Sequence, residues 1–488
     1  MKPEKILLSI DCGTSSIKVA AFDIAGNRKA FLKTHSPLDN IGGVLAVDFQ
    51  KTAEVVIKLL TELVNSSGLS RYIVAVTLTS QRSTCAFLDN EGKFIGNGIS
   101  WSDSHGGALL EELVNPDDFQ KITGMMPIPY ITAAKLCWLK KSDPEGFKRL
   151  ALIQLLGDYV LQQLGAETGL IDTTNASATG FFDCQKFEWS DYILKKLSIT
   201  SDQLPKVIPT GSIVGTINKK IAEKTMIPIG TPLITCGGDQ QCSYIGCCSP
   251  EKPVTAISMG TSFVICTMTQ KLVLNPKLLT LCGFKKWTIE GFQPSGGMCF
   301  NWIWKNILGN SEDLSEQFLK EISESGPGSR GVSFYPEVNS IDQGGICGIT
   351  PEIKSVDIIR AIFEGIAYET RYYHELFKKN GLDQNEVVLC GGFAGIKSWP
   401  EIYCNVLNKK IIVPKELNSA LLGAAIQGGI TLKIFEDLDE GFRRMFHPAR
   451  VISPDDKQTA IYDNLYSQFQ NNMIQWNDFK KRVDNGLS

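Results

Sequence analysis

The chain has little histidine and no clustered pairs of cysteine. Its 488 residues include four histidines and 14 cysteines, and no two cysteines form a CxxC pair. A structural zinc site needs clustered ligands, so the sequence predicts no site of this kind. This many unpaired thiols is typical of a reducing compartment, and we expect a cytoplasmic protein.

The sequence also lacks a strong net charge and a long apolar run. Its formal net charge is −3, which creates no strong field to attract nucleic acid or an acidic membrane surface. The first apolar run leads directly into Asp11 and is too brief for a signal peptide, and no other run is long enough to cross a bilayer. We therefore expect neither nucleic acid nor membrane as a partner.

The chain does contain one repeated segment. Residues 6–22 and 254–268 each read as a strand, a Gly-Thr-Ser turn and a second strand. Glycine permits a positive φ and a close approach of the backbone to a ligand, and the hydroxyls beside exposed N–H groups suit a phosphate. The sequence thus predicts a duplicated domain that holds a nucleotide between its halves, through Gly13, Thr14, Ser15, Gly260, Thr261 and Ser262.

The length and pattern predict an α/β protein of two large domains, because the chain is too long for one core. The pattern breaks near residues 245–253, so we place the domains at 1–247 and 248–488. Strands are expected at 6–11, 17–23, 28–34, 72–79, 84–88, 232–236, 387–390 and 411–413. Helices are expected at 51–65, 134–141, 156–164, 190–197, 218–224, 299–307, 312–323, 354–379, 398–407 and 418–428, before a polar, partly helical tail.

Two carboxylates and a glycine pair follow predicted strands. Asp11 precedes the first turn and suits Mg²⁺ held beside phosphates, or it caps the turn. Asp239 follows a buried strand and two glycines that would leave room for a substrate; it suits a base that accepts a hydroxyl proton, or it is a helix N-cap. Gly391 and Gly392 suit a nucleotide contact at a helix N-terminus, or simple strand–helix packing.

Six blocks in order give a specific resemblance to the FGGY family of carbohydrate kinases, a branch of the actin/hexokinase-like ATPases. The resemblance runs from about residue 5 to residue 430. The blocks are residues 11–16, 130–139, 172–177, 237–241, 258–262, and 391–392 with 420–425.

The resemblance implies two ribonuclease-H-like domains that flank a deep cleft, with the acceptor on the N-terminal domain and ATP mainly on the C-terminal one. It implies that Asp239 is the catalytic base, that Asp11 organises Mg²⁺, and that the two turns hold the phosphates of ATP. It also implies that Gly391, Gly392 and Asn418 contact the nucleotide, although Asn418 stands where many members have Glu and Phe393 where many have a small residue.

The acceptor side most resembles that of glycerol kinases. A polyol needs a fork of donors, a carboxylate acceptor and an apolar wall, which Arg82, Asp239 and Trp101 supply. Arg82 and Trp101 could instead be a surface ion pair and a core aromatic residue. The full set of expected acceptor contacts is Gln81, Arg82, Trp101, Asp103, Tyr130 and Gln240. Glycerol kinases carry Glu after that Arg, whereas this chain has Ser83, so a longer acceptor is plausible.

We therefore predict an ATP- and Mg²⁺-dependent kinase that acts on a hydroxyl of a small polyol or open-chain sugar. Xylulose, a sugar acid such as gluconate, or a signalling sugar of the autoinducer-2 type are alternative acceptors. A non-catalytic, nucleotide-gated sugar-binding or regulatory module and a chaperone-like ATPase are alternatives of another class. A homodimer is common among relatives, but no residue of this chain demonstrates one.

Overall fold

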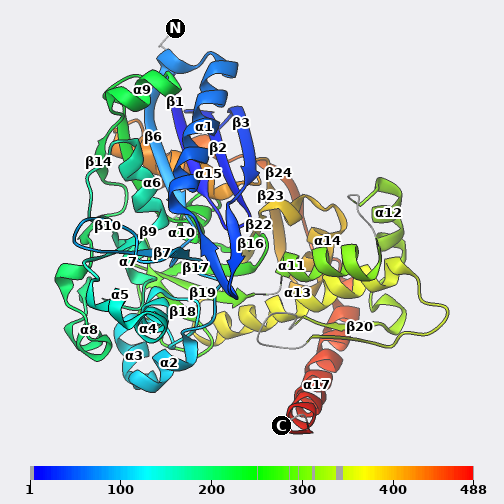
Figure 1. Cartoon of the computed structure of the whole chain (residues 1–488). Helices are drawn as coiled ribbons and strands as arrows, with labels where there is room; N and C mark the ends of the chain where they lie inside the picture. Colours follow the sequence, from blue (N-terminus) through cyan, green and yellow to red (C-terminus); the bar gives the residue numbers. More distant parts are fainter. Residues whose placement is uncertain are drawn as a thin grey trace. The chain divides into compact units, whose positions relative to one another are not determined.

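The chain forms two compact units (Figure 1). The structure is a computed structural model that describes residues 5–249, 251–284, 286–294, 296–309, 314–336 and 344–486. Unit 1 comprises Met1–Lys252, Met268–Glu290 and Asn418–Phe446, and unit 2 comprises Pro253–Thr267, Gly291–Leu417 and His447–Ser488. Two segments from the second half of the chain thus belong to unit 1.

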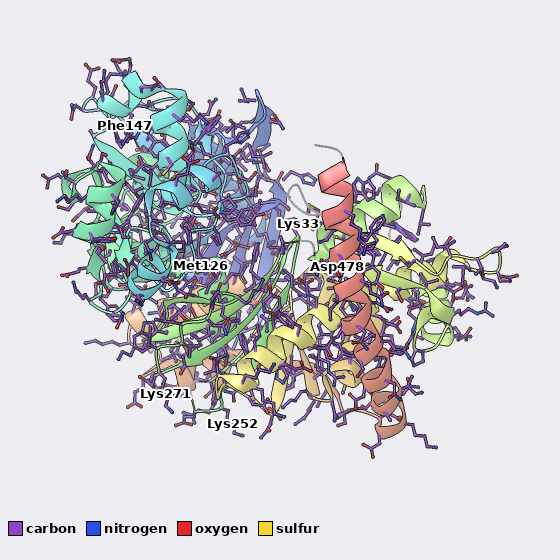
Figure 2. The ribbon with its side chains drawn as sticks, turned by 90° about the horizontal axis from the view of Figure 1, so that it is seen from below. Lys33, Met126, Phe147, Lys252, Lys271 and Asp478 are labelled. Carbon is purple, nitrogen blue, oxygen red and sulfur yellow. The ribbon has the colours of Figure 1, made fainter. Side chains whose placement is uncertain are left out.

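A six-stranded sheet with the order β14-β15-β6-β1-β2-β3 forms the centre of unit 1. Strands β1, β6 and β15 are parallel, whereas the pairs β1–β2, β2–β3 and β14–β15 are antiparallel. The bounds are β1 Ile6–Cys12, β2 Ser16–Asp23, β3 Arg28–His35, β6 Ile73–Ser80, β14 Ile213–Thr216 and β15 Pro232–Gly238. The edge strand β3 carries Lys33 (Figure 2) among other exposed charges, which discourage further pairing.

Both faces of this sheet are buried, because its strands alternate between two apolar cores. Ile6, Leu8 and Ile10 of β1 face a core that includes side chains of α1 and α6, while Leu7 faces a core that includes side chains of α10 and α15. The helices of these two layers are α1 Phe49–Ser67, α6 Leu156–Leu164, α9 Lys219–Thr225, α10 Asp239–Ile245, α15 Ser419–Thr431 and α16 Leu438–Met445.

The rest of unit 1 packs around a third core, with a sheet of order β4-β5-β8-β7-β9. Its bounds are β4 Leu38–Ile41, β5 Val44–Val47, β7 Cys85–Leu88, β8 Gly98–Ile99 and β9 Leu152–Leu155. The helices are α2 Gly107–Leu113, α3 Pro116–Thr123, α4 Thr132–Ser142, α5 Pro144–Lys148, α7 Thr173–Ser177 and α8 Asp191–Leu197. Short strands complete it: β10 Leu170–Asp172, β11 Phe182–Asp183, β12 Glu188–Trp189, β13 Lys206–Ile208, β18 Leu279–Cys282 and the first part of β19 Trp287–Gln293.

Unit 2 contains the run of strands β17-β16-β22-β23-β24. The bounds are β16 Thr255–Met259, β17 Phe263–Thr269, β22 Glu386–Cys390, β23 Lys410–Pro414, β24 Pro448–Ile452, β20 Ser333–Tyr335 and β21 Gly345–Cys347. The helices are α11 Gly296–Trp302, α12 Glu316–Glu324, α13 Ser355–Lys379, α14 Ser398–Leu407 and α17 Asp456–Gly486, on which Asp478 lies (Figure 2). Short helices in the chain are η1 Ser70–Tyr72, η2 Ser201–Gln203, η3 Ile303–Ile307, η4 Ser329–Gly331 and η5 Gly392–Gly395.

Most predicted elements are confirmed within a few residues, including both Gly-Thr-Ser hairpins. The helix expected at 299–307 is α-helical from Gly296 to Trp302 and continues as a π-helix. The helix expected at 312–323 is α12; residues 312 and 313 lie outside the described residues. The 14 cysteines, all of which the structure describes, form no disulfide, and Cys347 is the exposed one among them. In the described part of the chain, every helix is too short or too polar to cross a membrane.

Candidate active site

Two acidic residues lie at the carboxyl ends of two parallel strands in unit 1. Asp11 is near the end of β1, and Asp239 directly follows β15. Strand β6 lies between these two, and Arg82 follows it closely. Because the three strands are parallel, their carboxyl ends meet at one edge of the sheet, where α/β proteins commonly bind ligands. The structure thus brings Asp11, Arg82 and Asp239 together.

Asp11 has one carboxylate oxygen with a partner and one without. Its Oδ2 accepts a hydrogen bond from Lys18 Nζ at 2.9 Å, whereas its buried Oδ1 accepts none. The alternative that Asp11 caps the turn is therefore wrong. Mg²⁺ is commonly bound by one or two carboxylates together with waters and substrate phosphates. The Oδ1 atom fits this mode, and no group of three or more His, Cys, Asp or Glu side chains forms a fuller metal cage among the described residues.

Asp239 has the properties of a base that works near neutral pH. It is the first residue of α10, whose N-cap is Gly238, so the N-cap alternative is wrong. Its Oδ1 accepts from the backbone N–H of Gln240 at 2.9 Å, and 24% of its side chain stays exposed. Burial raises the pKa of Asp239 to about 6; the Arg82 charge opposes this shift, and the Asp11 and Glu290 charges add to it.

The glycine pair before Asp239 makes room for protein atoms rather than for a substrate. Gly237 has φ +92°, and a Cβ there would lie 2.3 Å from Thr174 Oγ1. A Cβ on Gly238 would lie 2.6 Å from Arg82 Cδ. Thr174 Oγ1 accepts from the N–H of Gly238 at 3.0 Å and donates to Asp172 Oδ1 at 2.6 Å. These contacts fix the backbone that aims Asp239.

Arg82 pairs with a carboxylate that the sequence analysis did not identify. Its Nη1 and Nη2 donate to the two oxygens of Glu290 in β19 at 2.9 and 2.8 Å. Its Nε lies 3.9 Å from Asp239 Oδ1. Side-chain exposure is 14% for Arg82 and 1% for Glu290, so the alternative of a surface ion pair is wrong. The geometry is the bidentate fork that arginine forms with carboxylates.

Trp101 and Tyr130 form an aromatic wall beside the first turn. The Trp101 indole Nε1 donates to Thr14 Oγ1 at 2.6 Å, and the two rings meet edge to face with centroids 5.9 Å apart. Both side chains are only half-buried, so Trp101 is not a core aromatic residue. The contact with Thr14 links this wall to the Gly-Thr-Ser turn.

Lys135 holds the segments that carry this wall. Its buried ammonium donates to three backbone carbonyls, those of Trp101 at 3.1 Å, Pro129 at 2.7 Å and Asp103. Burial lowers the pKa of Lys135 to about 8, and the Asp103 and Cys85 charges oppose that shift. The apolar surroundings of Lys135 in α4 gave no signal of this role in the sequence.

Two expected acceptor contacts are buried in the structure. Asp103 is 2% exposed, and its oxygens accept from the N–H of Leu45, the N–H of His105 and the His105 ring. Gln81 is 3% exposed and lines a small cavity with Gly13. Asp103 thus holds the neighbouring loops. The side-chain Oε1 of Gln81 has no hydrogen-bond partner among the described residues, and Arg82, Trp101, Tyr130 and Gln240 stay partly exposed.

In unit 2, the second turn lies beside the Gly391-Gly392 pair. The Gly260 N–H donates to Ser262 O at 3.2 Å, and neither Gly13 nor Gly260 has a positive φ. Gly391 does, at +86°, and a Cβ there would lie 2.6 Å from Met259 O, so strand packing explains this glycine. A Cβ on Gly392 would meet nothing within 4 Å, which leaves open space at that position.

Phe393 and Asn418 fall in different units. Phe393 packs against the rings of Phe263, Phe300 and Trp399 in unit 2, and a Cβ on Gly297 would lie 2.1 Å from its ring. Asn418 precedes α15 and belongs to unit 1, as does the helix with residues 420–425. The C-terminal half therefore supplies expected nucleotide contacts to both units.

The comparisons with known proteins agree with these features. Residues 6–246 match the N-terminal domain of the FGGY family of carbohydrate kinases, and residues 255–432 match its C-terminal domain. The chain is 24% identical to a xylulose kinase of Bacillus subtilis, with 96% of each chain covered. It is 26% identical to glycerol kinase 1 of Lactiplantibacillus plantarum, again with 96% of each covered.

The fold is also that of solved kinases. The gluconate kinase of Lactobacillus acidophilus superposes with a TM-score of 0.85 at 23% identity, over 96% of this chain and 97% of that one. This likeness confirms the expected two-domain α/β fold of the actin/hexokinase-like ATPases. The chain belongs to the FGGY family of carbohydrate kinases, and it is a phosphotransferase of that family.

Proposed function

We propose that this kinase transfers the γ-phosphoryl group of ATP to a hydroxyl of a small polyol or open-chain sugar, with Asp239 as the base. The observation that carries the proposal is the Asp239 carboxylate, which has a raised pKa and stays partly exposed beside Arg82. A base whose pKa lies near the working pH is ionised in the cell and still accepts a proton readily.

The acceptor residues orient and deprotonate the hydroxyl. The bond from the acceptor oxygen to the γ-phosphorus forms while the bond to ADP breaks, and the hydroxyl proton moves to Asp239. Trp101 and Tyr130 supply an apolar wall against the carbon chain, and Arg82 donates toward acceptor oxygens. Gln240 lies next to Asp239. Its side-chain amide can both donate a hydrogen bond to a hydroxyl and accept one from it.

The phosphate side of the proposal uses the two turns and Asp11. Asp11 would hold Mg²⁺ through water at its unpartnered Oδ1, and the ion would neutralise charge that develops on the phosphates. Residues 13–15 and 260–262 offer N–H and hydroxyl donors, and Gly391, Gly392 and Asn418 would contact the nucleotide. The second turn and the open position at Gly392 support this assignment, since both lie in one unit.

Some broader expectations belong to the same proposal. We retain the division into sequence domains 1–247 and 248–488, which the family matches at 6–246 and 255–432 support. The cleft between the domains, the homodimer and the cytoplasmic location stay predictions.

A panel of acceptors tests the proposal. Purified protein with MgATP is offered glycerol, xylulose, gluconate, other polyols and sugars, and no acceptor, and ADP release is measured. We expect at least one neutral acceptor to stimulate release well above the rate without acceptor, and the product to carry one phosphate by mass spectrometry.

The same panel separates the alternatives of another class. If every acceptor leaves ADP release at its basal rate while ATP still raises the melting temperature, the protein is a binding module and the proposal is wrong. If a protein partner rather than a sugar stimulates hydrolysis, the chaperone-like reading is correct.

A further inference from the structure

The buried ion pair between Arg82 and Glu290 bears on which acceptor the kinase takes. Glu290 is 1% exposed, and both of its oxygens accept from the two terminal nitrogens of Arg82. A buried charge is costly unless it is paired and hydrogen-bonded, so each partner depends on the other. The pair also fixes the Arg82 side chain, because a bidentate bond allows a single orientation.

The pair decides how much positive charge the site can offer. The terminal nitrogens of Arg82, which form the fork that recognises a carboxylate, face Glu290, and Nε lies 3.9 Å from Asp239. Within the set formed by Asp11, Lys18, Arg82, Asp239 and Glu290, three carboxylates outweigh two cations. An acceptor that carries its own carboxylate would compete with Glu290 for Arg82 and would be repelled by Asp239.

A neutral hydroxyl meets no such conflict. It can accept from the guanidinium and donate to a spare lone pair of a carboxylate at the same time. We propose that Glu290 is a specificity-determining residue: by holding the Arg82 fork, it makes the site select a neutral polyol or open-chain sugar and reject a sugar acid. This inference rests on the proposed function, because it places Arg82 in the acceptor site.

The test compares acceptors of equal length that differ in one terminal group. Glycerol is paired with glycerate, and a six-carbon polyol is paired with gluconate. For wild type we expect kcat/KM for the neutral member to exceed that for the acid by about tenfold or more, a difference of about 1.4 kcal/mol. We expect Glu290→Gln, which removes the charge and keeps the shape, to raise the acid-to-neutral ratio by about tenfold, mainly through KM for the acid.

Two control variants separate charge from folding. Glu290→Asp keeps the charge, so the ratio should stay within about threefold of wild type. Glu364 forms a comparable buried pair with Arg360 in unit 2, with a 2.9 Å contact and 3% exposure. Glu364→Gln should lower the melting temperature, because it breaks a buried ion pair. It should leave the ratio of kcat/KM for the acid to kcat/KM for the neutral acceptor unchanged.

The outcomes distinguish this inference from the proposed function. If wild type phosphorylates the neutral member and Glu290→Gln leaves the ratio unchanged, the inference is wrong and the function stands. If wild type prefers the acid, the inference is wrong even where Glu290→Gln fails to fold. If wild type phosphorylates no member of these pairs and no other acceptor of the panel, the proposed function fails and the inference fails with it.

Discussion

The two Gly-Thr-Ser hairpins share a turn but differ in what flanks it. In β1–β2, the Gly13 N–H bonds to Ser16 O, and in β16–β17 the Gly260 N–H bonds to Ser262 O, both at 3.2 Å. Asp11 lies opposite Lys18 across the first hairpin, whereas Ser258 lies opposite Val264 across the second. Both units therefore have the polar Gly-Thr-Ser turn, whereas the charged pair of Asp11 and Lys18 has a counterpart of Ser258 and Val264 in unit 2. We infer that both turns bind phosphate, while acid–base and metal chemistry belong to unit 1.

The largest expected effect comes from the base. We expect Asp239→Asn to lower kcat by about 10²- to 10⁴-fold, the range for loss of a general base. Since burial raises the pKa of Asp239, ionising it at neutral pH costs stability, and the neutral amide should fold at least as stably. Steady-state kinetics measures kcat, and thermal unfolding measures the stability.

The matched control for this change is Asp191→Asn. Asp191 is also the first residue of a helix, α8, but it is exposed. Near-normal turnover in Asp239→Asn, or an equal loss in both variants, would refute the base assignment.

The next effect concerns the charged pair of the first hairpin. Asp11→Ser places in the first hairpin the residue type that the second hairpin has at the equivalent position, Ser258. We expect about a 10²-fold loss of kcat/KM, which higher Mg²⁺ recovers only partly. Rates measured across a Mg²⁺ titration report this change. Ser258→Ala, at the equivalent position of the second hairpin, should cost less than about threefold. Equal losses in the two variants would show that the hairpins do not differ in this way.

A smaller effect is expected at the tether of the aromatic wall. Lys135→Met leaves three carbonyls without their donor, so we expect a loss of about 2 kcal/mol in the free energy of unfolding and about a tenfold higher acceptor KM. Denaturant unfolding and steady-state kinetics measure these. Lys140→Met is the control on the same helix, since its ammonium donates to the exposed hydroxyl of Ser198 and lies over the Phe147 ring, away from the aromatic wall's carbonyls. An unchanged KM in Lys135→Met would remove Lys135 from the acceptor site.

The smallest effects come from the glycine pair in unit 2. Gly391→Ala should lower the free energy of unfolding by about 1–3 kcal/mol, because φ is +86° and the new Cβ would meet Met259 O. Gly392→Ala has open space and should change it by less than about 0.5 kcal/mol, although it should weaken ATP binding if a nucleotide lies there. Thermal unfolding and ATP titration test both, and a reversed order of stability would contradict the geometry.

The sequence predicted the elements that repeat and the residues that end buried strands. The two hairpins and the strand before Asp239 were evident because apolar runs stop at glycine. Glu290 was not evident, since it lies 208 residues from Arg82 and its strand was not predicted. Lys135 was missed because the sequence of an apolar helix does not show which backbone carbonyls a lysine in it will bond. The glycine pair was assigned to a substrate because the sequence could not show that Arg82 and Thr174 fill that space.

The pH dependence of kcat/KM for the best neutral acceptor tests the central claim most directly. The groups that act on Asp239 are Arg82, Asp11, Glu290 and the Gln240 N–H. Because Asp239 must be ionised to accept the proton, we predict that kcat/KM falls about tenfold per pH unit below a pKa of about 6. A profile that stays flat from pH 7 down to the range of an ordinary aspartate would contradict the claim that this partly buried carboxylate is the base.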